Sequence, residues 1–256
     1  MSEKTVLLHK NNNIATLVLN RPEIMNALNP ELIQALQDAL DQIEGDKDVR
    51  VVVLKGSGEN FCSGADMNIL AEAHSSDQLL QAMRHVGSVI RRLRGIPQPI
   101  ITALRGVAVG GGANLALAGD FVITAEDARF CEIFIHLGLI LDMGGTYFLP
   151  RLVGLIKARE LAFLGEEIDG KTAAAIGLVY KSVPAEELDN EAAVLAGKLA
   201  QRSLAALALI KEGLEGSFDK NLKEILDWEA AHQAVMLQTS AHKEIVKLFF
   251  ESRKKD

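Results

Sequence analysis

The chain has 256 residues, of which 48% are hydrophobic, and its formal net charge is −7. That length fits one domain with a sizeable core, and the negative charge argues against general nucleic-acid binding. Two cysteines without a CxxC spacing and six histidines without an HExxH spacing predict neither a disulfide framework nor a metal site. A polar N-terminus, and no apolar run long enough to span a bilayer, lead us to expect a cytoplasmic protein with no membrane partner.

The first part of the chain alternates strand patterns with helix patterns. Asn29 and Pro30 fit the start of a helix, as its N-cap and its first residue. Such alternation implies crossover connections and a largely parallel sheet, so the fold class is α/β. The predicted strands are 5–9, 14–20, 51–54, 100–104 and 121–124, and the predicted helices are 31–43 and 79–94, with a short buried helix near 115–118.

The chain becomes mostly helical beyond Gly154, and only the run 178–182 looks extended. We expect residues 1–200 to form the core with the active site and residues 201–256 to form a helical C-terminal region. The predicted helices of this half are 184–201, 204–214, 222–237 and 240–250.

A cluster of three glycines, Gly110 to Gly112, stands between the strand at 100–104 and the short helix. Glycine lets a ligand approach bare backbone, and the free N–H groups of a helix start favour negative charge. The cluster therefore predicts a place to hold an anion, including one that forms during a reaction. A tight, closely packed turn is the alternative, and the pattern matches neither GxGxxG nor a Walker A loop.

Four segments together resemble the crotonase (enoyl-CoA hydratase/isomerase) superfamily over nearly the full length. They are Leu19-Asn-Arg-Pro22 with Asn26-Ala-Leu28, Phe61-Cys-Ser-Gly-Ala-Asp-Met67, the stretch from Gly106 to Asp120, and Gly144-Gly-Thr146 with Leu149-Pro-Arg151. The resemblance implies repeated ββα units, a helical C-terminal trimerisation region, and a homotrimer or dimer of trimers. It also implies an acyl-CoA substrate from fatty acid or aromatic acid degradation, with coenzyme A as part of the thioester and no separate cofactor.

The resemblance also assigns residues to the site. The backbone N–H groups of Ala65 and Gly111 are expected to form an oxyanion hole around the thioester carbonyl. The adenine-binding segment falls on Ala65, Asp66, Met67 and Asn68, and Phe250 and Lys254 resemble the C-terminal helix that closes the CoA site. The basic end around Lys254 fits a CoA phosphate or a solvated tail equally well.

Two positions depart from the family's hydratase pattern. Hydratases use two glutamates, but Asn114 stands at the first position and Phe134 at the second, both placed at the substrate. Asparagine can orient a water or a carbonyl but cannot act as a general acid or base near neutral pH. Glu132 lies two residues from the second position, and the fixed spacing to Gly138 and Gly144 argues against a shifted register.

Asp142 is the remaining candidate for a catalytic acid. Family members with an acid at this position of a similar segment include enoyl-CoA isomerases and ring-opening isomerases. One carboxylate suffices for a double-bond shift, since it can take a proton from C2 or C4 of a 3-enoyl thioester and return it at the other carbon. We expect Leu139, Ile140, Leu141 and Met143 to desolvate Asp142 and make it a better base. The alternative is a helix N-cap before Gly144.

Three hypotheses for the function follow. The first is an isomerase that shifts the double bond of an enoyl-CoA with Asp142 as its acid and base. The second is an enoyl-CoA hydratase that works without the usual glutamates. The third is a non-catalytic acyl-CoA-binding homologue, suggested by the loss of both glutamates.

Overall fold

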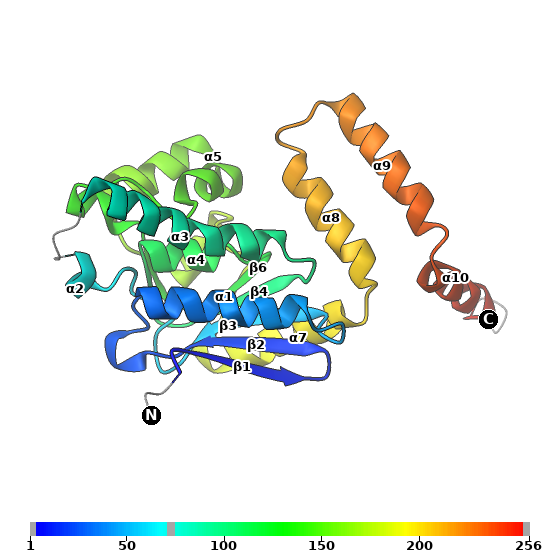
Figure 1. The fold of residues 1–256 in the computed structure, drawn as a ribbon, viewed down its shortest axis with the longest axis horizontal. Coiled ribbons are helices and arrows are strands. Elements are labelled where there is room, and N and C mark those ends of the chain that lie inside the picture. The colour runs from blue at the N-terminus through cyan, green and yellow to red at the C-terminus, as the bar shows by residue number, and fades with distance from the viewer. Residues whose placement is uncertain (1–3, 71–74, 253–256) are drawn as a thin grey trace. The chain divides into compact units, whose positions relative to one another are not determined.

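The computed structural model describes residues 4–70 and 75–252. The chain forms two compact units, one over residues 1–200 and the other over residues 201–256, and Figure 1 shows the elements of each. The first unit is mixed α/β and contains both the segment from Phe61 to Met67 and the glycine cluster from Gly110 to Gly112. The second unit is helical.

Six strands of the first unit form one sheet in the order β1-β2-β3-β4-β6-β9. β1 and β2 are an antiparallel hairpin, and each later pair of neighbours is parallel. The apolar side chains of β3 and β4 are buried, as expected for parallel strands with both faces covered. These pairings confirm the predicted parallel sheet. The strands are β1 (Val6–Asn11), β2 (Ile14–Leu19), β3 (Val51–Gly56), β4 (Ile100–Leu104), β6 (Phe121–Ala125) and β9 (Lys181–Val183).

Helices pack against this sheet. α1 lies against β1 and β2 and contacts α3, and α7 lies against β2, β3, β4 and β6 (Figure 1). The Asn29 side chain accepts a hydrogen bond from the Leu32 N–H, and Pro30 is the first helical residue, which confirms the predicted start of α1. The α-helices of this unit are α1 (Pro30–Glu44), α2 (Met67–Leu70), α3 (Ser76–Gly95), α4 (Gly111–Leu117), α5 (Gly145–Leu164), α6 (Gly170–Ala175) and α7 (Leu188–Ala200).

A second, three-stranded sheet in the order β5-β7-β8 was not expected from the sequence. β5 (Val107–Val109) pairs in parallel with β7 (Arg129–Cys131), and β7 pairs antiparallel with β8 (Ile168–Asp169). β5 leads directly into the glycine cluster and α4. A 3₁₀ helix, Ile133–Leu137, follows β7. The small sheet therefore sets the positions of the glycine cluster after β5 and of the 3₁₀ helix after β7.

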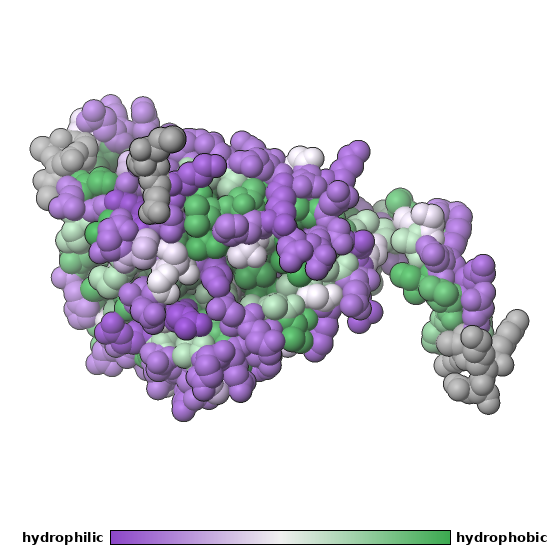
Figure 2. Space-filling view, turned by 90° about the horizontal axis from the view of Figure 1, so that it is seen from below, coloured by the Kyte–Doolittle hydropathy of each residue, from purple (hydrophilic) through white to green (hydrophobic). Residues whose placement is uncertain are grey.

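The second unit contains α8 (Leu204–Gly216), α9 (Leu222–Met236) and α10 (Ser240–Ser252). These helices keep large apolar side chains exposed, and Figure 2 shows apolar surface along the helices of this unit. Among the described residues no single helix is long and apolar enough to span a bilayer, although the segments 185–200 and 204–216 pass that test of length and composition when joined. The exposed apolar residues of these helices include Ile210, Leu214, Leu222, Leu226, Val235, Ile245, Leu248, Phe249 and Phe250.

Candidate active site

Two segments lie side by side in the first unit: the first loop (residues 61–67) and the second loop (residues 106–112). The Cys62 N–H donates to the Val107 carbonyl at 2.9 Å, and the Val109 N–H donates to the Cys62 carbonyl at 3.1 Å. These bonds hold the first loop beside β5 and the start of α4. The approach is close enough to require glycine, since a Cβ on Gly112 would lie 2.3 Å from the Cys62 carbonyl oxygen.

The predicted oxyanion-hole donors, Ala65 and Gly111, come from these adjacent segments. The Leu28 N–H donates to the Gly64 carbonyl and the Asp66 N–H donates to the Leu28 carbonyl, so this parallel bridge turns the Ala65 N–H away from Leu28. Gly111 is the first residue of α4, where an N–H has no acceptor within the helix. A Cβ on Gly64 would lie 3.7 Å from the Gly111 nitrogen. The geometry supports the predicted pair of donors, whose role stays a prediction.

An ion pair fixes the first loop. The Arg21 guanidinium contacts the Asp66 carboxylate at 3.1 Å and donates to the Ala27 carbonyl at 2.6 Å. The Asn68 N–H donates to the other Asp66 oxygen at 3.2 Å. Burial acts to raise the pKa of Asp66, but the bonds from Asn68 and Arg21 hold it below the usual value. The Asp66 side chain is therefore engaged in holding the loop.

Three polar residues, Asn114, Glu132 and Asp142, lie together near the start of α4. Asn114 Nδ2 donates to the Asp142 backbone oxygen at 3.0 Å and to Glu132 Oε2 at 3.3 Å. Asn114 and Glu132 are buried, with exposed fractions of 0% and 1%, whereas Asp142 is half-buried. A Cβ on Gly111 would lie 3.6 Å from Asp142 Oδ1, so this carboxyl stands beside a predicted oxyanion donor.

Both acids of this cluster hold their protons more tightly than usual. Burial raises the pKa of Asp142 to about 6. Burial also raises the pKa of Glu132 to about 8, with a further contribution from the neighbouring Asp142 charge and an opposing one from the Asn114 hydrogen bond. At neutral pH this arrangement favours a charged Asp142 beside a neutral Glu132.

The other predicted site residues lie in several places. Phe134 is buried, and a Cβ on Gly110 would lie 3.6 Å from its ring, so it lies against the glycine cluster. Met67 and Asn68 are exposed at the start of α2. Phe250 is exposed in the second unit, and Lys254 lies outside the described residues.

The expected desolvation of Asp142 is confirmed, because burial raises its pKa to about 6, but the segment around it differs from the prediction. Leu139 and Ile140 were expected to bury Asp142, yet they are 49% and 86% exposed, because the chain between Gly138 and Asp142 crosses the surface. The N-cap of α5 is Gly144, with no side-chain cap bond, so the alternative role of Asp142 as the helix N-cap is wrong.

Glu132 was not expected at the site, because Phe134 was placed at the second glutamate position. The structure brings it into the cluster, because the chain after β7 keeps its side chain inside the protein. The sequence signal for this was its position two residues after Phe130 of β7, since side chains two residues apart along an extended backbone share a face.

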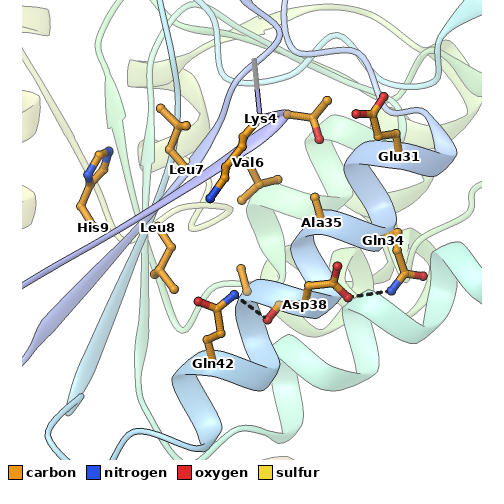
Figure 3. Close-up of a pocket in the computed structure, with 12 residues that line it drawn as sticks. Lys4, Val6, Leu7, Leu8, His9, Glu31, Gln34, Ala35, Asp38 and Gln42 are labelled. Carbon is orange, nitrogen blue, oxygen red and sulfur yellow. Dashed lines mark hydrogen bonds between the residues drawn. The ribbon is translucent and has the colours of Figure 1, made fainter. Parts of the chain in front are cut away.

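A groove of about 500 Å³ lies elsewhere, between β1 and α1 (Figure 3). Its lining mixes Lys4 and His9 with Glu31 and Asp38. None of the predicted site residues lines it, and it has no part in the site described above.

The chain is similar to known proteins over nearly its full length. Residues 9–256 match the family described as enoyl-CoA hydratase/isomerase. The chain belongs to this family. It is 37% identical to the 1,2-epoxyphenylacetyl-CoA isomerase of Escherichia coli K12, over 97% of this chain and 96% of that protein. It is 35% identical to a probable enoyl-CoA hydratase of Rhodobacter capsulatus, over 99% of this chain and 97% of that protein.

A solved structure confirms the crotonase-type α/β fold. The enoyl-CoA hydratase of Bacillus anthracis superposes with a TM-score of 0.93 at 33% identity, over 97% of this chain and 96% of that one. The chain is thus an enzyme of the enoyl-CoA hydratase/isomerase family, which sets aside the hypothesis of a non-catalytic homologue.

Proposed function

We propose that this enzyme shifts the double bond of an enoyl-CoA, with Asp142 as its acid and base. The observation that carries the proposal is the placement of the half-buried Asp142 carboxyl beside Gly111, at the start of α4. Asn114, which is hydrogen-bonded to the Asp142 backbone, cannot exchange a proton near neutral pH. The relative named 1,2-epoxyphenylacetyl-CoA isomerase supports an isomerisation of a CoA thioester.

The chemistry needs one base and one pair of N–H donors. The Asp142 carboxylate removes a proton from C2 of a 3-enoyl thioester, and the electrons move onto the thioester oxygen to give a dienolate. The Ala65 and Gly111 N–H groups bind that oxyanion, and one such donor contributes roughly 3 kcal/mol in a site that excludes water. Asp142 then returns the proton at C4, which yields the conjugated 2-enoyl product.

Hydration is the second candidate, because the structure holds two carboxyls, Glu132 and Asp142, at one site. Hydratases activate water with one carboxylate and protonate carbon with the other. Glu132 is only 1% exposed, whereas Asp142 is half-buried, so Asp142 is the better placed of the two acids to reach a bound substrate. This burial favours the isomerase.

The first test is turnover of a 3-enoyl-CoA and of crotonyl-CoA by the wild type and Asp142→Asn. The proposal expects fast formation of the 2-enoyl product, lost in the variant by at least about a thousandfold, as for removal of an essential base. Hydration of crotonyl-CoA that survives Asp142→Asn would contradict it. Binding of the thioester by the variant, followed by calorimetry, shows that the site is intact.

We also propose that the helices over residues 201–256 form a homotrimer, or a dimer of trimers. Their exposed apolar residues, such as Leu214 and Leu248, fit burial against other subunits. Native mass spectrometry of the full chain is the test, and a monomer at micromolar concentration would contradict it.

A further inference from the structure

Glu132 is a buried acid that the proposed double-bond shift does not use. It follows β7, is 1% exposed, and is close enough to Asp142 for the two charges to interact. A charged carboxylate in such a place is costly unless hydrogen bonds or a cation compensate it. Among the described residues, the one hydrogen bond to the Glu132 side chain is the long bond from Asn114 at 3.3 Å.

The Asn114 amide has a defined orientation. Its neighbour at 3.0 Å is the backbone oxygen of Asp142, which can only accept, so the amide nitrogen must face it. The same nitrogen therefore faces Glu132 Oε2, and its two protons supply the two bonds. Oε2 of Glu132 is thus an acceptor, which leaves Oε1 as the oxygen that can carry a proton.

Three oxygens of these residues are buried and have no hydrogen-bond partner among the described residues: Asn114 Oδ1, Glu132 Oε1 and Asp142 Oδ1. If both acids were ionised, all three would be acceptors, and the described part of the chain supplies no donor to them. A proton on Glu132 Oε1 turns one of the three into a donor and removes a buried charge.

The charged groups around Glu132 agree with a neutral state. Beside Glu132, burial raises the pKa of the Cys131 thiol, which is therefore neutral and supplies no compensating positive charge. From the loop before α5 the facing acid is Asp142. Arg129, the cation of β7, contacts Glu167 at 3.7 Å. Within the described residues no ion pair to Glu132 is present.

We propose that Glu132 is a positioning residue for Asp142, a neutral carboxylic acid that fixes the Asn114 amide and through it the backbone that carries the catalytic carboxylate. This inference rests on the proposed isomerase, and it adds a residue that does not touch the substrate. Glu132 and Asp142 together hold one proton in the resting enzyme, and that proton is on Glu132.

The kinetic test compares Glu132→Gln, Glu132→Ala and the control Glu167→Gln on a 3-enoyl-CoA between pH 5 and 10. Glutamine copies the neutral acid, since it accepts from Asn114 and donates in place of the hydroxyl. We expect its kcat at pH 7 to stay within about threefold of wild type and that of Glu132→Ala to fall roughly tenfold or more, with little change in KM. Glu167→Gln, an exposed acid nearby, should leave kcat unchanged.

The pH profile separates positioning from packing. Above pH 8 the wild type should lose kcat, because an ionised Glu132 places a second negative charge beside the dienolate. Glu132→Gln should lack this decline and Glu167→Gln should keep it. A decline that persists in Glu132→Gln, or a kcat in that variant as low as in Glu132→Ala, overturns the proposal.

Infrared spectroscopy of the full enzyme tests the proton without turnover. A carboxylic-acid C=O band should be present at pH 7 in wild type and Asp142→Asn and absent in Glu132→Gln. Absence of the band in wild type overturns the proposal even if isomerisation is found. If the band is present but no 3-enoyl-CoA is converted, the neutral Glu132 stands and the proposed isomerase fails.

Discussion

The side-chain amide of Asn114 on α4 donates to the backbone oxygen of Asp142 at 3.0 Å, which ties the helix that begins at Gly111 to the loop with the candidate base. The two parts of the proposed chemistry, oxyanion binding and proton transfer, are therefore fixed to each other by one side chain. Asn114 cannot act as an acid or base near neutral pH, and its role in the structure is to hold the Asp142 loop against α4.

Asn114→Ala is expected to lower kcat more than it changes KM. The substitution removes the donor to both Asp142 and Glu132 and leaves buried acceptors unpaired, which costs about 1–3 kcal/mol for each group. Steady-state kinetics on a 3-enoyl-CoA and thermal unfolding check this. Unchanged kcat with a lowered melting temperature would show that the amide serves stability alone.

The pH dependence of kcat is expected to report Asp142. Its pKa is raised to about 6 by burial, and the base must be ionised to remove the C2 proton. kcat should therefore rise as pH increases through about 6 and level off near pH 7. A profile flat between pH 5 and 7 would mean that another group is the base or that a step other than proton transfer limits the rate.

Glu132→Gln is expected to stabilise the fold increasingly as pH rises from about 4.5 to about 8. The pKa of Glu132 is about 8 in the folded protein against 4.5 for an ordinary glutamate, so unfolding releases a proton within that range. The stability associated with the protonated acid is complete below pH 4.5 and is lost as pH rises through 8, by on the order of 5 kcal/mol.

Urea unfolding of wild type and Glu132→Gln at pH 5 and pH 8 measures that difference. Asp142 is common to both proteins and its own titration largely cancels in the comparison. An equal difference in unfolding free energy at the two pH values would show that Glu132 is ionised in the folded protein.

The main sheet and the glycine loops were predictable because their signals are local. The run 100–104 is apolar and flanked by breakers, and it forms β4 with the predicted bounds. The helix cap at Asn29 and the turn at the glycine cluster depend on residues that are adjacent in sequence, so the residue types alone predict them.

The small sheet and the role of Glu132 were not predictable in the same way. β5, β7 and β8 have two or three residues each, so no periodicity develops, and their pairing depends on chain segments far apart in sequence. The spacing to Gly138 and Gly144 placed Phe134, and not Glu132, at the site. The burial of Glu132 results instead from tertiary packing after β7. The exposure of Ile140 likewise follows from the path of the loop and not from its hydrophobicity.

Gly112→Ala is expected to separate the two loops that the proposed oxyanion hole needs. A Cβ there would lie 2.3 Å from the Cys62 carbonyl oxygen and 2.8 Å from the Cys62 Cβ, so the backbone must move, at a cost of about 1–3 kcal/mol or more. The matched control is Gly197→Ala in α7, where a Cβ meets nothing within 4 Å and alanine should stabilise the helix by about 0.5–1 kcal/mol. Unfolding free energies and turnover of a 3-enoyl-CoA check both variants. Because the Gly111 N–H lies next to the altered position, the loss of kcat in Gly112→Ala should persist at temperatures where the variant is fully folded, and full activity there would contradict the assigned donor.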